Sequence, residues 1–77
     1  MNDARRKRLL ESVLPLISEA RCHLEEVGSE ETEAVDNLPD GLRESERGQR
    51  MQEIAYALDD AVTALESLED SLRECTE

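Results

Sequence analysis

At 77 residues, the chain has room for one small domain, residues 1–77, whose apolar residues are aliphatic apart from a single Tyr. Leu, Glu, Ala and Arg dominate, and this composition favours helix over strand. The net charge is −11, and from Leu9 onward 19 acids face only 5 bases. Because phosphate contacts need clustered Lys or Arg, the acidic body argues against direct nucleic-acid binding.

The first predicted helix spans about residues 4–36. Pro15 lacks an N–H and would clash with the carbonyl of Glu11, so it predicts either a kink or the true start of the helix. Gly28 costs about 1 kcal/mol relative to Ala without ending a helix. The open alternative is a break at Gly28-Ser29, with Ser29 capping a short second helix. The heptad a and d positions are Leu10, Val13, Ile17, Ala20, Leu24, Val27, Glu31, Ala34 and Leu38.

A turn is predicted at residues 37–44. Pro39-Asp40-Gly41 suits positions i+1 to i+3 of a type I turn, because Pro presets φ and Gly tolerates the exit. Ser45 is the predicted N-cap of the next helix. Leu38 and Leu42 are expected to close the end of the core. The turn and cap residues are therefore Leu38, Pro39, Gly41, Leu42 and Ser45.

The second predicted helix spans about residues 45–75 and carries an unbroken heptad pattern. Ala55 and Val62 fall at the flanking e position and widen its apolar stripe, while Glu and Asp fill most of the opposite face. Tyr56 falls at an outward f position. The a and d residues are Met51, Ile54, Leu58, Ala61, Leu65, Leu68, Leu72 and Cys75.

The predicted fold class is all-α, an antiparallel two-helix hairpin, because a connection this short makes consecutive helices antiparallel neighbours. Folding about residue 40 would set residues 5–8 beside residues 73–76. The basic cluster Arg5-Arg6-Lys7-Arg8 would then lie against Glu74 and the other acids of that end. The same cluster is also open to a second interpretation, attraction to anionic lipid or nucleic acid.

The hairpin is expected to pair with another chain. A domain of this size buries only about 60% of the surface that its unfolded chain exposes, and one seam leaves much of a broad apolar stripe uncovered. A homodimer forming a four-helix bundle buries all the stripes; an unidentified protein partner is the alternative. The predicted core and dimer interface comprises Leu10, Val13, Ile17, Leu24, Val27, Met51, Ile54, Leu58, Val62, Leu65, Leu68 and Leu72.

No catalytic residue, metal site or cofactor is predicted. His23 is the only histidine, and with Cys22 it falls short of the three or four ligands of a zinc site. A di-metal site in a bundle uses inward Glu-x-x-His pairs, which are absent here. Glu31 is the one inward acid, and we expect it either to sit where the seam opens near the turn or to pair with an Arg such as Arg47 or Arg50.

The two cysteines, Cys22 and Cys75, lie too far apart in the hairpin for a disulfide. No apolar run reaches ten residues, and nothing resembles a secretory signal. We therefore expect a cytoplasmic, reduced setting without membrane association.

The turn segment Asn37–Gly48 reads N-L-P-D-G-L-R-E-S-E-R-G. It resembles a group of small uncharacterised acidic helical-hairpin proteins of bacterial genomes, often in phage-derived regions, that share an N-L-P-x-x-L-x-x-S-E-R-G turn motif. The likeness covers about residues 30–75, is specific only in the turn, and leaves Pro15 and Gly28 as departures in the first helix. It implies the fold without an activity, and suggests that Ser45, Glu46 and Arg47 form a hydrogen-bonded cap or a partner-facing surface.

The function expected from the sequence is a non-enzymatic protein–protein interaction or structural role, performed as a self-associating acidic helical bundle. The alternative is an acidic mimic of nucleic acid that inhibits a DNA-binding protein, an idea motivated by the charge density. An enzyme is not expected, because no nucleophile–base pair stands out in the sequence.

Overall fold

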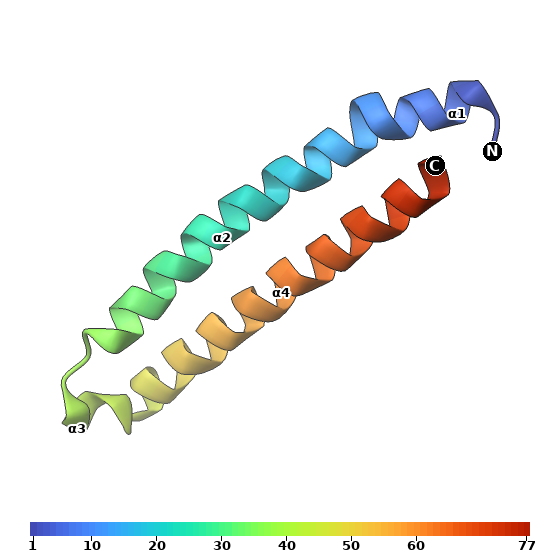
Figure 1. Cartoon of the computed structure of the whole chain (residues 1–77). Coiled ribbons are helices and arrows are strands. Elements are labelled where there is room, and N and C mark those ends of the chain that lie inside the picture. Colours follow the sequence, from blue (N-terminus) through green and yellow to red (C-terminus); the bar gives the residue numbers. More distant parts are fainter.

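A computed structural model describes all 77 residues as helices joined by short connections, with no strand. The elements in chain order are α1 (Asp3–Arg8), the π-helical turn η1 (Leu9–Val13), α2 (Leu14–Asp36), α3 (Asp40–Arg43) and α4 (Glu46–Thr76). One arm (α1, η1 and α2) and a second arm (α4) lie side by side in opposite directions, joined at α3 (Figure 1). The predicted helical hairpin is confirmed, as a rod of 58 × 15 × 14 Å.

The first arm is a continuous helical path from Asp3 to Asp36, begun by an Asn2 side chain that accepts a hydrogen bond from the Arg5 amide. In η1, the Leu14 amide donates to the carbonyl of Leu9, five residues back. This wider turn comes immediately before Pro15, where an ordinary turn would press the proline ring against a carbonyl. The proline therefore causes a π-helical turn rather than starting the helix.

The connection between the arms differs from the predicted type I turn. Pro39 has φ −58° and ψ 146°, so it precedes the one-turn helix α3 rather than occupying position i+1. Its carbonyl accepts hydrogen bonds from the amides of Leu42 and Arg43. A proline with an extended ψ is a common way to begin a helix, because its ring clashes with nothing on that side. The turn bounds are nevertheless close to those expected, since α2 ends at Asp36 and α4 begins at Glu46.

The seam between the arms uses heptad positions a and e rather than a and d. From Leu14 onward, every a residue and every e residue of both long helices is buried or half-buried. In contrast, Ala20, Val27 and Ala34 at d positions of α2, and Leu68 at a d position of α4, are exposed. The seam is rotated toward the e side, where Gly28 faces Leu58 and the polar residues described below bind across it.

The register of the hairpin is also different from the one expected. Ser18 and Arg21 contact Glu69, whereas folding about residue 40 would have placed them beside residues 63 and 60. The extra turn of α3 moves the centre of the connection past residue 40. As a result, α1 extends beyond the C-terminal end of α4 (Figure 1).

The predicted pairing of the basic cluster with the acidic tail is therefore wrong for the single chain. Within that cluster, only Arg6 makes an ion pair, at 3.0 Å from Asp3 of the same helix. At the other end, Arg73 pairs with Glu69 and Asp70 of its own helix. The shifted register leaves no part of α4 opposite α1.

Gly28 continues α2 without a break, so the alternative of a second short helix capped by Ser29 is wrong. A Cβ added at Gly28 would lie 3.7 Å from the Cβ of Leu58, an ordinary van der Waals contact. We expect Gly28→Ala to raise the free energy of unfolding by about 0.5–1 kcal/mol, since alanine costs less backbone entropy in a helix. Urea unfolding followed by circular dichroism measures this change, and a loss of stability would contradict the spacing of the two helices described here.

Candidate functional site

A cluster of charged side chains crosses the seam in the half nearer the open end of the hairpin. Glu69 of α4 is only 2% exposed. Its Oε2 accepts a hydrogen bond from the Ser18 hydroxyl at 3.0 Å, and its Oε1 accepts one from Arg21 Nε at 2.5 Å. Arg73, one turn along α4, donates to Oε2 at 3.3 Å. Three donors from two helices therefore surround one carboxylate.

The electrostatics of the cluster favour its charged form. The hydrogen bond from Arg21 lowers the pKa of Glu69 below its usual value, with smaller contributions from Ser18 and Arg73 that together outweigh desolvation. The pKa of Arg21 is raised by its hydrogen bonds to Glu69 and Glu25, the latter at 2.6 Å. Because Ser18 and Arg21 of α2 both bind this carboxylate of α4, the cluster holds the two helices in one register.

The sequence analysis missed this cluster, although a signal was present. Arg21 and Glu69 both occupy e positions, and opposite charges at such flanking positions of neighbouring helices form interhelical pairs. The predicted register placed Arg21 beside residue 60, nine residues from Glu69, so the pattern did not indicate that the two side chains meet.

A second set of hydrogen bonds builds the corner between α3 and α4. Ser45 is the N-cap of α4: its hydroxyl accepts from the Gly48 amide at 3.1 Å and donates to the Leu42 carbonyl at 2.6 Å. Arg43 donates to the carbonyl of Asp36 at 2.8 Å, at the end of α2. Gln52 donates to the carbonyl of Arg43 at 3.1 Å. Glu46 and Arg47 are exposed and form no side-chain hydrogen bond in this corner.

The residues predicted for the core and interface fall into two groups. Those at a positions, together with Val62, are half-buried in the seam: Ile17, Leu24, Met51, Leu58, Leu65 and Leu72. The others lie at or outside its edge. Val13 and Ile54 are half-buried, and Leu10, Val27 and Leu68 are 45%, 49% and 44% exposed. In the turn, Leu38 is half-buried, whereas Pro39, Gly41 and Leu42 are exposed.

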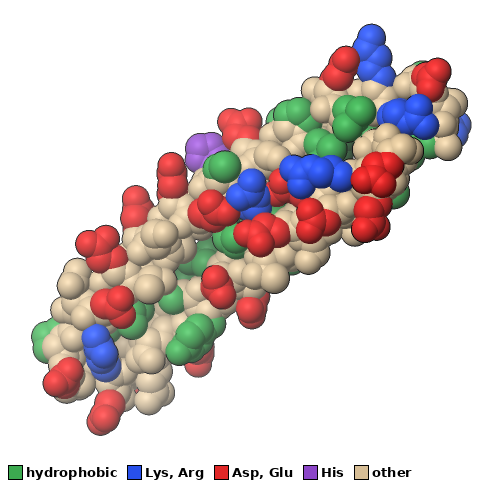
Figure 2. All heavy atoms as spheres, viewed as in Figure 1, with side chains coloured by type: hydrophobic (Ala, Val, Ile, Leu, Met, Phe, Trp, Pro, Cys, Tyr) green, Lys and Arg blue, Asp and Glu red, His purple; other side chains and the backbone are tan.

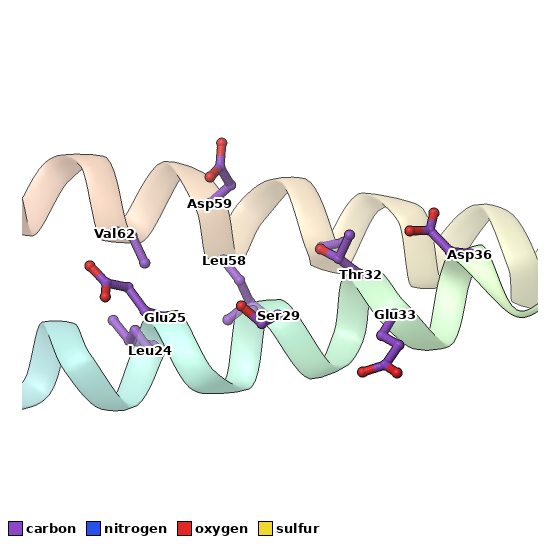
Figure 3. Close-up of a pocket in the computed structure, with 11 residues that line it drawn as sticks. Leu24, Glu25, Ser29, Thr32, Glu33, Asp36, Leu58, Asp59 and Val62 are labelled. Atoms are coloured by element: carbon purple, nitrogen blue, oxygen red, sulfur yellow. The ribbon is translucent and has the colours of Figure 1, made fainter.

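A shallow groove runs along one side of the seam between α2 and α4 (Figure 3). Its floor is apolar, formed by Leu24, Leu58 and Val62, and its rim carries the carboxylates of Glu25 and Asp59. No histidine or cysteine lines this groove. Its surface is acidic and open.

The remaining candidate residues stay apart from one another. His23 is exposed and lies 3.8 Å from Glu19, one turn away. Cys22 and Cys75 are exposed free thiols. Glu31 is half-buried at its a position and makes no ion pair, so the predicted pairing with Arg47 or Arg50 is wrong; Arg50 pairs instead with Glu53. No group of three or more His, Cys, Asp or Glu side chains is gathered to hold a metal ion.

None of the helices is both long enough and apolar enough to span a membrane. Comparison with protein-family models, with curated proteins and with solved structures finds no match to this chain. The candidate site is therefore defined by the chain's own surface, which combines an acidic groove on one side with exposed d-position residues on the other.

Proposed function

We propose that this protein is a non-enzymatic interaction or structural protein that acts as a self-associating acidic helical bundle, a homodimer of hairpins in a four-helix arrangement. A reducing cytoplasmic setting suits its two exposed thiols. The resemblance of the turn to small acidic hairpin proteins of bacterial and phage-derived genomes supports the hairpin architecture and carries no activity with it.

The observation that carries this proposal is the near absence of an interior in the single chain. Only 3 of 77 residues are buried, and Leu14 is the only large hydrophobic residue among them. Leu10, Val27 and Leu68 leave about half of their area in water. Burying one such side chain stabilises a fold by about 1.5–3 kcal/mol, and small domains without disulfides or metals commonly obtain that burial by oligomerising.

The mass of the protein in solution tests the proposal. Sedimentation equilibrium at micromolar concentration, with circular dichroism on the same samples, should give twice the 8.7 kDa of one chain together with high helix content. Helix content should fall on dilution in step with the mass, because association supplies part of the burial. A fully helical monomer across this range would contradict self-association.

A second candidate, an acidic mimic of nucleic acid, is favoured by where the acids lie. Of the 20 acidic residues, only Glu31 and Glu69 are not exposed, so negative charge covers both arms (Figure 2). A mimic of this kind should displace DNA from a DNA-binding protein in a gel-shift competition. Its binding should weaken steeply with added salt, and competition that raised salt leaves unchanged would contradict this second function.

A further inference from the structure

The d positions of the two arms lie on the same face of the hairpin; five of them are exposed, and Val13, Ile54 and Ala61 are half-buried. On each helix, the side that faces the neighbouring helix is centred midway between positions a and e. Position d lies a little under a quarter turn around the helix from that centre. Viewed from one end, residue numbers run clockwise around one helix and anticlockwise around its antiparallel neighbour. The d residues of both helices therefore project from the same side of the hairpin. We call this side the d face; its residues are Val13, Ala20, Val27, Ala34, Ile54, Ala61, Leu68 and Cys75.

The opposite side, where the b positions lie, has a different chemistry. It carries Glu25 and Thr32 of α2, and Asp59, Glu66 and Arg73 of α4. The groove of Figure 3 and the ionic cluster around Glu69 are both on this side. The hairpin is thus a two-sided rod, and only the d face presents a continuous apolar strip of the kind that marks an interface.

The overhanging α1 is the second observation. It carries Arg5, Lys7 and Arg8 as exposed cations without an acid opposite them, and Leu10 in the adjoining η1 is 45% exposed. In the body of α2, Glu31 is the only acid at an a or d position of either long helix, and it lacks a partner in its own chain. The first arm therefore has a basic end whose exposed cations lack acidic partners, and an unpaired acid, Glu31, nearer the turn.

We propose, resting on the self-association above, that the d face binds the d face of a second copy with the two turns at opposite ends of the bundle. Two face-to-face arrangements satisfy two-fold symmetry. With the turns together, each α1 projects beyond both copies of α4, so Leu10 stays in water and the two basic ends lie at the same end of the bundle. With the turns opposite, each first arm lies antiparallel on the first arm of the second copy, which covers the overhang.

Charge complementarity favours the arrangement with the turns at opposite ends. It does so in either of two registers that set d residues of the two first arms opposite each other. If Ala20 faces Ala20 of the second copy, residues 5–8 lie against residues 32–35, which include Glu33. If Ala20 faces Val27, they lie against residues 39–42, which include Asp40. Both registers place the basic end on an acidic part of the second copy, and like charges are kept apart.

A distance between the two turns tests this orientation. Gly41 has no atom within 4 Å of an added Cβ, so a label attached there meets no atom of its own chain at the point of attachment. In a Cys22→Ser, Cys75→Ser background, label attached through Gly41→Cys should show a label-to-label distance of about 50–60 Å at 1.5 Å per residue. Turns placed together would instead give about 20–30 Å, from helices spaced about 10 Å apart and the label linkers.

The mass of the same labelled sample separates the two hypotheses. A dimer with the long distance supports the orientation. A dimer with the short distance overturns the orientation and leaves self-association intact. A monomer overturns both.

Matched substitutions test the face itself. Leu68→Ser lies on the d face, and Tyr56→Ser lies at an f position outside it; both side chains are exposed in the single chain, at 44% and 70%. Leu68→Ser should weaken dimerisation about 100-fold or more, since each dimer loses two buried leucines, while Tyr56→Ser should change it less than about threefold. Equal effects of the two substitutions would overturn the assignment of the d face.

Discussion

Gly48→Ala is expected to destabilise the hairpin by about 2–3 kcal/mol, a large effect for one added methyl group. Gly48 is buried in the first turn of α4, where the chain doubles back against α3. A Cβ at this position would lie 2.1 Å from the carbonyl oxygen of Leu42 and 2.8 Å from that of Arg43. Both obstacles are backbone atoms, so no side-chain rotation relieves the overlap.

Moving α3 away from α4 to relieve this overlap would weaken the hydrogen bonds of the corner. The Ser45 hydroxyl binds both the Gly48 amide and the Leu42 carbonyl, and Gln52 binds the Arg43 carbonyl. Separating α3 from α4 would lengthen all three of these hydrogen bonds. The loss exceeds the gain of about 1 kcal/mol that alanine normally brings to a helix.

Gly41→Ala is the matched control, because a Cβ at Gly41 meets nothing within 4 Å and its φ is not positive. We expect this substitution to leave stability unchanged or to raise it slightly. Chemical denaturation at one fixed protein concentration compares the two variants. If Gly48→Ala proved as stable as Gly41→Ala, the close approach of α3 to α4 described here would be wrong.

Glu69→Gln should remove a distinct part of the protein's stability near neutral pH and make the unfolding free energy less sensitive to acid. The carboxylate of Glu69 accepts from Ser18, Arg21 and Arg73, and this environment lowers its pKa in the folded chain. A neutral amide offers one acceptor oxygen in place of two charged ones. Arg21 and Arg73 would therefore lose the charge of Glu69 and keep only Glu25 and Asp70, respectively, as anionic partners.

The sign of the pH dependence follows from the lowered pKa. A carboxyl whose folded pKa lies below its unfolded value, about 4.3 for Glu, contributes stability that is complete above that value. The contribution is lost as pH falls through the folded pKa, because the unfolded chain then binds the proton first. Wild-type protein and Glu69→Gln should therefore differ most near pH 7 and converge toward pH 3.

Glu66→Gln provides the control, since Glu66 is exposed one turn before Glu69 and makes no ion pair. Urea unfolding across the pH range from neutral to acid measures all three proteins. Glu66→Gln should follow the wild-type curve closely. Parallel pH curves for Glu69→Gln and wild type would show that the cluster does not hold the helices together.

Much of the fold was determined by the sequence alone. The heptads of residues 51–75, the helix-forming composition and the Pro-Gly connection were local signals, and they predicted two antiparallel helices with ends within a few residues of those observed. They succeeded because helix formation and helix termination depend on residues a few positions apart.

Other features were decided by tertiary structure. The one-turn helix α3 lengthened the connection and shifted the register so that α1 extends past α4. The rotation of the seam from a/d to a/e places Arg21 and Glu69, both at e positions, in contact across it. Such choices depend on which residues meet between helices, and a periodic pattern is nearly unchanged by a small rotation or a shift of one heptad.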